Sequence, residues 1–281
     1  MKYFQIDFTL NPYNEDVCDV LSSTLADIGF ETFVPTAQGI TAYVQQNVFE
    51  EEYLKRAISD FVLPGYSITY NTMEAPDEDW NQTWEEEGFE PIVLDDMVCV
   101  HDTRHQAPPS RYDIIINPRM AFGTGAHPTT QQILRYLTEA DLQGKKVIDA
   151  GCGTGVLSIL ASMRGASHVF SYDIDEWSVE NTRINAGLNG TDNIEVQEGD
   201  ANVLPQDGKY DLLIANINRN ILLEDMEQFA KALKLHGRLL LSGFYETDVP
   251  MLIERARELG FVPEIQTTKD GWAMLMLQLC P

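Results

Sequence analysis

A glycine-rich turn between an apolar strand and a helix is the feature that most constrains how this chain can fold. Residues 146–150 are a predicted strand, and residues 155–164 are a predicted helix. The turn between them holds Gly151, Gly153 and Gly155. Glycine permits a positive φ and a close approach of the backbone to a ligand. Because this strand–turn–helix unit forms the nucleotide-binding crevice of open α/β sheets, it predicts an α/β domain with a ligand at the end of this strand.

The spacing of these glycines separates two classes of ligand. The three glycines give G-x-G-x-G and are followed by Val156, whereas a dinucleotide fingerprint needs G-x-G-x-x-G. Asp149 lies two residues before the first glycine. This arrangement resembles motif I of class I S-adenosylmethionine-dependent methyltransferases, which makes Asp149, Gly151 and Gly153 candidate cofactor contacts. A nicotinamide-dependent oxidoreductase is the alternative that the spacing disfavours, and a cofactor titration separates the two.

From residue 130 onward, predicted helices and strands alternate, which is typical of a largely parallel sheet. Asp270-Gly271 joins the last two predicted strands and is a hairpin turn signal. A parallel sheet that ends in an antiparallel hairpin is the class I methyltransferase pattern. The predicted strands are 146–150, 168–173, 193–197, 210–215, 238–242, 262–268 and 272–279, and the predicted helices are 130–138, 155–164, 176–188, 221–234 and 248–259.

Three polar residues lie where predicted strands end. Asp173 follows one β-α unit after the glycines, where a carboxylate can accept both ribose hydroxyls of a cofactor. Asp200 follows the next strand and is expected to accept the adenine amino group, with ordinary Gly-Asp turn chemistry as the alternative. Asn216 is expected to face the methyl-transfer centre. Because Ile217 follows it, the N-P-P-aromatic signature of base and glutamine methyltransferases is absent, which argues against an amide or base nitrogen as acceptor.

A second glycine loop precedes the helix at 130–138. It runs from Asn117 to Thr130, places Pro128 near the helix start, and lacks the Gly-Lys-Ser/Thr of a Walker A loop. The amides of the helix N-terminus, together with Thr130, can hold the carboxylate end of the cofactor. His127 is interpreted as structural in preference to a general base.

The residues before this region divide into two further parts. Residues 1–74 follow the order β-α-β-β-α-β, which suggests a ferredoxin-like α+β unit, and they contain no cluster of catalytic residue types. Residues 75–117 are interpreted as a linker with short strands of its own, and residues 118–281 as the catalytic domain. Within the linker, Trp80 and Trp84 are one helical turn apart, and core packing or domain docking is favoured for them over ligand contact.

The net charge limits the partners of the chain. Its 44 acidic and 19 basic residues give a net charge of -25. Such a surface repels phosphate backbones, so tight nucleic-acid binding is disfavoured. The same field attracts a basic protein, and solubility alone is the alternative explanation for the charge.

The cysteines and the hydropathy pattern indicate the compartment. Cys18, Cys99, Cys152 and Cys280 lie far apart and form no CxxC pair, so we expect no zinc or other metal site and no disulfide framework. A reduced cytosol is the simplest setting for such a chain. No stretch approaches the ~18 consecutive apolar residues of a membrane span, so none is expected.

The second glycine loop carries a resemblance to a known family. It closely resembles the N-P-G-x-A-F-G-T-G-x-H-P-T-T signature of bacterial ribosomal protein L11 methyltransferases. Further segments match the same family in order and approximate spacing, so the resemblance covers nearly the whole chain. These segments are the glycine motif, Asp79-Trp80, Asp173-Ile174-Asp175 and Ala215-Asn216-Ile217.

The resemblance implies a class I S-adenosylmethionine-dependent domain, preceded by an N-terminal domain that recognises the substrate. It also implies transfer of methyl groups to lysine side chains and the N-terminal amine of ribosomal protein L11. By match to the family, Thr130, Gly151, Asp173 and Asn216 would be cofactor contacts. We further expect Asn216 to orient the acceptor amine, and we expect no general base, no membrane association and a monomer in the cytoplasm.

Two segments depart from the family pattern. Arg119 stands where the family usually has glycine, and Asn218-Arg219 replaces the usual Leu-Ala. Both departures concern the acceptor pocket, which decides which amines are methylated. The alternatives are a methyltransferase that acts on another protein, on RNA or on a small molecule, and a non-catalytic protein that only binds S-adenosylmethionine.

Overall fold

The computed structural model divides the chain into two compact units, Met1–Trp80 and Asn81–Pro281. Trp80 and Trp84, together with Asp79, lie outside the residues that the structure describes, and so does Arg119. The described residues are 3–26, 28–46, 48–59, 61, 65–74, 89–117, 123 and 125–281.

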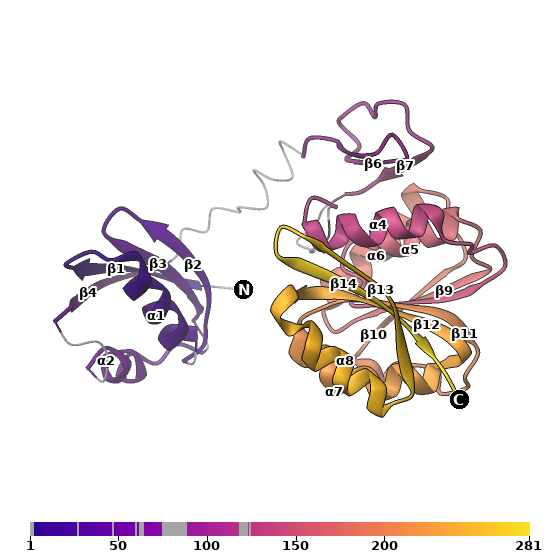
Figure 1. Ribbon diagram of the computed structural model, residues 1–281. Helices are drawn as coiled ribbons and strands as arrows, with labels where there is room; N and C mark the ends of the chain where they lie inside the picture. The colour runs from indigo at the N-terminus through magenta and orange to yellow at the C-terminus, as the bar shows by residue number, and fades with distance from the viewer. Residues whose placement is uncertain are drawn as a thin grey trace. The chain divides into compact units, whose positions relative to one another are not determined.

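The first unit is a four-stranded antiparallel sheet with two helices, and its strand order is β2-β3-β1-β4. With the chain order β-α-β-β-α-β, this is the ferredoxin-like arrangement that the sequence predicts (Figure 1). Apolar side chains at alternating positions of β1, including Ile6 and Phe8, pack with Leu21 of α1 and Leu54 of α2 in one buried cluster. The elements are β1 (Tyr3–Asn11), α1 (Glu15–Ala26), β2 (Phe30–Thr36), β3 (Gly39–Gln45), α2 (Glu51–Ser59) and β4 (Ser67–Glu74).

The second unit is built on a seven-stranded sheet of order β10-β9-β8-β11-β12-β14-β13. The first five strands in this order are parallel, and β14 is antiparallel to both of its neighbours. The predicted parallel sheet with a terminal antiparallel hairpin is therefore confirmed. The strands are β8 (Lys146–Ala150), β9 (His168–Asp173), β10 (Ile194–Glu198), β11 (Tyr210–Asn216), β12 (Leu233–Tyr245), β13 (Phe261–Lys269) and β14 (Trp272–Leu279).

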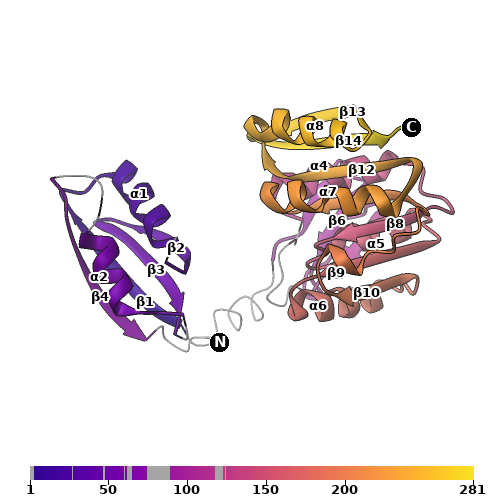
Figure 2. The same ribbon diagram turned by 90° about the horizontal axis from the view of Figure 1, so that it is seen from below.

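Helices cover both faces of this sheet. Figures 1 and 2 show α4, α5 and α6 on one face and α7 and α8 on the other. Two apolar clusters fill the spaces between the layers, because the strands are apolar on both faces. The helices are α4 (Pro128–Glu139), α5 (Val156–Met163), α6 (Glu176–Leu188), α7 (Arg219–Ala232) and α8 (Val249–Glu258).

A small three-stranded sheet precedes the large one. It consists of β5 (Ile92–Leu94), β6 (Val98–His101) and β7 (Tyr112–Ile115), with β5–β6 antiparallel and β6–β7 parallel. Val100 and Ile114 are fully buried in the same apolar cluster as residues of α4 and α5. These residues therefore pack as part of the second unit.

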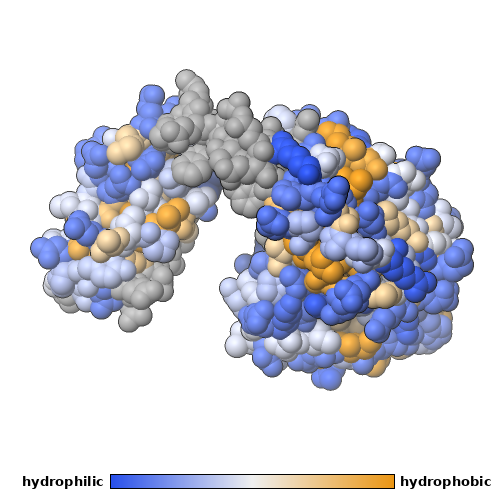
Figure 3. Space-filling view, turned by 90° about the horizontal axis from the view of Figure 1, so that it is seen from above, coloured by the Kyte–Doolittle hydropathy of each residue, from blue (hydrophilic) through white to orange (hydrophobic). Residues whose placement is uncertain are grey.

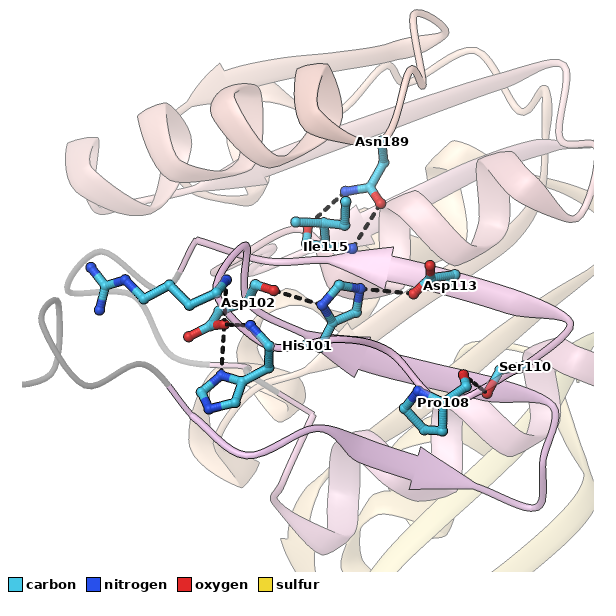
Figure 4. Close-up of polar contacts among 9 residues, drawn as sticks. His101, Asp102, Pro108, Ser110, Asp113, Ile115 and Asn189 are labelled. Atoms are coloured by element: carbon cyan, nitrogen blue, oxygen red, sulfur yellow. Dashed lines mark hydrogen bonds and ion pairs between the residues drawn. The ribbon is translucent and has the colours of Figure 1, made fainter.

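Polar contacts fix this small sheet (Figure 4). His101 Nε2 pairs with Asp113 Oδ1 at 2.8 Å, and its Nδ1 lies 2.6 Å from the carbonyl oxygen of Asp102. Asn189, which follows α6, exchanges two hydrogen bonds with the backbone of Ile115, of 2.9 and 2.7 Å. The end of β7 is thereby held against α6, and the second glycine loop begins from this fixed point.

The surface is predominantly hydrophilic on the face drawn in Figure 3, where hydrophobic residues gather only in small separate patches. This agrees with the large excess of acidic residues in the sequence. No helix in the described part of the chain is long and apolar enough to cross a membrane. Within the same residues, no group of three or more His, Cys, Asp or Glu side chains is placed to hold a metal ion.

Candidate active site

A cavity of about 470 Å³ lies at the carboxyl ends of β8, β9 and β11. The chain continues from β8 outward through β9 and β10 and returns on the other side of β8 at β11, so this is the topological switch point of the sheet, where open α/β sheets bind their ligands. The lining residues are Gly123, Thr130, Gly151, Cys152, Gly153, Val156, Leu157, Tyr172, Asp173, Ile174, Ser178, Asp200, Asn216, Ile217, Asn218, Ile221, Glu224 and Asp225.

The glycine turn forms the floor of the cavity. Gly151 has a φ of 72°, and a Cβ at this position would lie 2.4 Å from Cγ2 of Ile217. The amides of Gly151 and Cys152 donate to the carbonyl oxygen of Tyr172 at 2.9 and 3.1 Å. Only glycine combines this conformation with this close approach, so the motif predicted from spacing has a direct steric cause.

Asp173 is held at the cavity by backbone amides. Its Oδ2 accepts a hydrogen bond from the amide of Gly153 at 3.0 Å, and its Oδ1 accepts one from the amide of Asp175 at 3.1 Å. Each carboxylate oxygen has more than one acceptor site, so both can still accept a ligand hydroxyl. The arrangement fits the predicted role in ribose binding.

Asp149 lies behind the glycine turn and is not among the residues that line the cavity. It is fully buried, and its Oδ2 accepts a hydrogen bond from the hydroxyl of Ser158, which also contacts Ser171 at 2.8 Å. Burial raises the pKa of this carboxyl from 3.8 to about 6. The geometry assigns Asp149 to the support of the turn, and its predicted cofactor contact stays a prediction.

Asn216 and Thr130 lie together on the other side of the switch point. The side-chain amide of Asn216 donates to the hydroxyl of Thr130 at 3.2 Å. The amide oxygen of Asn216 is buried and accepts no hydrogen bond from any described residue. A buried acceptor without a partner costs free energy, so it points to a ligand donor in the cavity.

The far end of the cavity is acidic. Asp200 caps a short 3₁₀ helix (Ala201–Val203) by accepting a hydrogen bond from the amide of Asn202 at 2.9 Å. It also lines the cavity, so the Gly-Asp turn chemistry and a position at the cofactor are compatible. Burial, followed by the nearby charges of Glu224 and Asp200, raises the pKa of Asp225. Three acidic side chains therefore lie where the adenine amino group was predicted to bind.

Tyr172 is a cavity residue that sequence reasoning missed. Its hydroxyl is buried and has no hydrogen-bond partner among the residues that the structure describes. Burial raises the pKa of this phenol well above its usual range, so it stays protonated and can donate to a ligand. Its position next to Asp173 in β9 was an available signal, because both residues end the strand at the cavity.

Two asparagines of α6 and the asparagine that caps its C-terminus were also missed. Asn185 accepts from the amide of Asn117 at 2.8 Å and donates to the carbonyl oxygen of Thr154 at 2.8 Å, and Asn181 donates to the carbonyl oxygen of Asn117 at 2.7 Å. With Asn189 they occupy positions i, i+4 and i+8, a spacing visible in the sequence. They connect the second glycine loop to the first.

His127 caps helix α4. Its Nδ1 accepts from the amide of Thr129 at 3.3 Å, and its ring lies edge-on to Trp272 with centroids 4.7 Å apart. Burial lowers the pKa of this imidazole. The predicted structural role is therefore confirmed, and the cap fixes the turn of helix that carries Thr130.

The structure thus brings together six of the seven residues predicted as cofactor contacts, and Asp149 is the exception. Those that line the cavity are Thr130, Gly151, Gly153, Asp173, Asp200 and Asn216.

The cavity suits the cofactor that the glycine spacing suggested. It combines a floor that only glycine fits, a fixed carboxylate at Asp173, and buried groups at Tyr172 and Asn216 that have no partner in the described part of the chain. With the seven-stranded sheet and its antiparallel β14, these features define a class I S-adenosylmethionine-dependent methyltransferase. The model of the family described as ribosomal protein L11 methyltransferase (PrmA) matches residues 22–279, and the chain belongs to this family.

Similar proteins agree with this assignment. The ribosomal protein L11 methyltransferase of Phocaeicola vulgatus is 48% identical over 274 residues, covering 97% of this chain and 98% of that protein. The protein of the same name from Bacteroides fragilis is 45% identical over 280 residues, covering 99% of this chain and all of that protein. The crystal structure of a ribosomal protein L11 methylase from Lactobacillus delbrueckii subsp. bulgaricus matches 69% of this chain and all of its own, with a TM-score of 0.63 and 29% identity.

Proposed function

We propose that this methyltransferase transfers methyl groups from S-adenosylmethionine to amino groups of ribosomal protein L11, namely lysine side chains and the N-terminal amine. The names of relatives that match along almost the whole chain support this substrate. The observation that carries the chemistry is the buried amide oxygen of Asn216, which has no partner among the described residues and belongs to a residue that lines the cavity.

Charge supports a basic protein as the substrate. The net charge of -25 creates a field that attracts a cationic partner and speeds encounter with it. The same field opposes tight binding of a nucleic acid, whose phosphates are repelled. A basic ribosomal protein therefore fits this surface better than RNA does.

The N-terminal unit is proposed to recognise the substrate. It has its own sheet and apolar core, so it is a separate folded body. All the residues that line the described cavity belong to the second unit. We assign recognition to residues 1–74, the connection to residues 75–117, whose small sheet packs within the second unit, and methyl transfer to residues 118–281.

The cofactor is proposed to contact the cavity residues predicted from the sequence. Asp173 binds the ribose hydroxyls, Asp200 the adenine, and Thr130 with the α4 N-terminus the carboxylate end. Gly151 and Gly153 let the backbone approach the cofactor, and Asp149 supports them from behind.

The bound cofactor supplies a methyl group on a positively charged sulfur. Thr130 accepts the side-chain N–H of Asn216, which leaves the amide oxygen of Asn216 to accept an N–H of the incoming amine. This contact orients the nitrogen lone pair, and orientation is a large part of the rate for such a displacement. The amine must be neutral to react, and removal of a lysine ammonium from water lowers its pKa from ~10.4. No described residue is assigned as a general base.

Mass spectrometry of L11 after incubation with the full chain and S-adenosylmethionine tests the substrate. We expect a gain of one CH2 per methyl transferred, with fragment ions placing the gains on lysines and the N-terminal nitrogen. Purified RNA and an unrelated basic protein serve as parallel substrates. Methylation of either of these in place of L11, alongside demonstrated cofactor binding, would remove L11 from the proposal.

We also propose that the chain acts in the cytoplasm as a monomer. Its four cysteines, all in the described part of the chain, form no disulfide, and three of them are buried, which suits a reducing compartment. Light scattering on the purified chain tests the oligomeric state, and a mass of twice 31.7 kDa would contradict it.

A further inference from the structure

Arg219, one of the departures from the family pattern, is tied to a turn at the end of β12. Its Nη1 pairs with Oδ1 of Asp248 at 2.8 Å. The other oxygen of Asp248 accepts a hydrogen bond from the amide of Tyr245 at 3.1 Å. Asp248 is mostly buried and connects Arg219, at the start of α7, with Tyr245, at the end of β12. Loss of the Arg219 side chain therefore frees the carboxylate that holds the Tyr245 amide.

Tyr245 belongs to a row of rings. Its ring stacks on Trp272 with centroids 4.1 Å apart and an interplanar angle of 30°. Trp272 in turn meets the ring of His127 edge-on. A backbone hydrogen bond from Glu246 to Gly271, of 2.9 Å, holds the two strand ends together. The Tyr245 side chain is 52% exposed, so one face of this row is open to a partner.

The row of rings is linked to Asn216 through helix α4 and through strand β12, which pairs with Asn216 at Ser242. His127 caps helix α4. In the first turn of this helix, the hydroxyl of Thr130 accepts a hydrogen bond from the side-chain amide of Asn216. At the other end of the row, Gly243 lies two residues before Tyr245, and a Cβ there would be 2.3 Å from the carbonyl oxygen of Ile217, the residue after Asn216. Asn216 is therefore connected to the rings on one side through Thr130 and the start of α4, and on the other through Ile217 and the end of β12.

We propose that Arg219, acting through Asp248, holds Tyr245 against Trp272, and that this aromatic pair is the wall along which an acceptor lysine side chain reaches Asn216. The inference rests on the proposed function. Aromatic faces attract both the aliphatic stem and the cationic end of a lysine. Arg219 alone would repel that cation, but Asp248 compensates its charge. Arg219 is thus a positioning residue for the acceptor.

If the aromatic pair guides the acceptor, it favours lysine side chains over the N-terminal α-amine, whereas a purely structural role of the pair would affect both kinds of amine equally. A lysine side chain presents a four-carbon stem to the rings, whereas an N-terminal α-amine has none. Loss of the wall should therefore reduce lysine methylation more than α-amine methylation. The ratio of the two, measured by peptide mass spectrometry on the same L11 sample, reports this difference within one reaction.

Two variants test the wall and its support. We expect Tyr245→Ala to lower the ratio of lysine to α-amine methylation about tenfold, and Arg219→Ala about threefold, with an unchanged cofactor Kd. Tyr245→Phe keeps the ring, and Arg219→Lys keeps the ion pair, so both should retain the wild-type ratio. Arg255→Ala, which removes an exposed Arg–Glu258 pair of 3.0 Å from the same unit, is the matched control and should leave the ratio unchanged.

The outcomes separate the two proposals. An equal loss at both kinds of amine in Tyr245→Ala, with a normal cofactor Kd, would overturn the wall. A ratio unchanged by Arg219→Ala would overturn the role of Arg219. A wild-type chain that binds cofactor and transfers no methyl to L11 would instead overturn the proposed function, and this is seen before any variant is compared.

Discussion

The two sides of the cavity are built in different ways. The cofactor half, formed by residues 149–155 and Asp173, is held by backbone amides and by glycine conformations. The proposed acceptor half is Asn216 together with the aromatic pair outside the cavity lining, and Thr130, which also serves the cofactor, lies at its border. It is held by side-chain contacts between elements far apart in the sequence. The difference teaches that the half serving a common cofactor is encoded locally, whereas the half serving a particular acceptor depends on tertiary contacts.

Asp149 provides the largest expected effect on stability and tests how firmly the cofactor half is buried. The folded state raises the pKa of this carboxyl from 3.8 to about 6, so its ionisation favours unfolding. Its stabilising contribution is full below pH 3.8 and is lost as the pH rises through about 6. We expect the stability of Asp149→Asn relative to wild type to increase by about 2 kcal/mol between pH 4 and pH 7. Denaturant titrations at both pH values measure this difference, and a constant offset would contradict it.

Gly151 tests the steric basis of the cofactor half. In Gly151→Ala the new methyl group meets Ile217, so we expect the cofactor Kd to rise about tenfold. Gly144 is the matched control, because it also has a positive φ, of 71°, but has open space around a Cβ. Gly144→Ala should carry the backbone strain alone and keep the wild-type Kd. Calorimetric titration measures both variants, and equal Kd changes would show that strain and not contact with Ile217 is responsible.

Thr130 tests how the side chain of Asn216 is held in place, because its hydroxyl accepts the hydrogen bond from the Asn216 amide. Thr130→Val keeps the shape and removes the hydroxyl that orients the Asn216 amide. We expect the single-turnover rate to fall about fivefold, which corresponds to the loss of one hydrogen bond. Thr129→Val is the comparison within the same turn, where the hydroxyl contacts His127 and not Asn216. A larger rate loss in Thr129→Val than in Thr130→Val would contradict the assignment.

The same difference explains what the sequence could predict. The ends of β8, β9 and β11 were located from apolar runs, and because parallel strands end at one edge, Gly151, Asp173 and Asn216 were expected near each other. Asp149 lies behind the turn in hydrogen-bond contact with Ser158, a tertiary contact that the glycine spacing does not contain, and its predicted cofactor contact stays a prediction.

Other features depended on packing that no local pattern contains. The pairing of Arg219 with Asp248, and that of Tyr245 with Trp272, join residues separated by 29 and 27 positions. Strand β12 was predicted at 238–242 and begins at Leu233, because pairing with β11 extends it through a polar segment. Strand β5 was not distinguished, since its three residues are too few for a periodic signal.

The central claim is that Asn216 orients the acceptor amine in addition to its predicted contact with the cofactor, and the most direct measurement compares cofactor binding with methyl transfer in Asn216→Ala. Cofactor Kd is measured by titration, and the single-turnover rate is measured with L11 and saturating cofactor. We expect a Kd within about twofold of wild type and a rate about 100-fold lower, because an unoriented amine loses the benefit of positioning. A full rate with normal binding, or a rate loss fully explained by weaker cofactor binding, would contradict the division of the cavity into two halves.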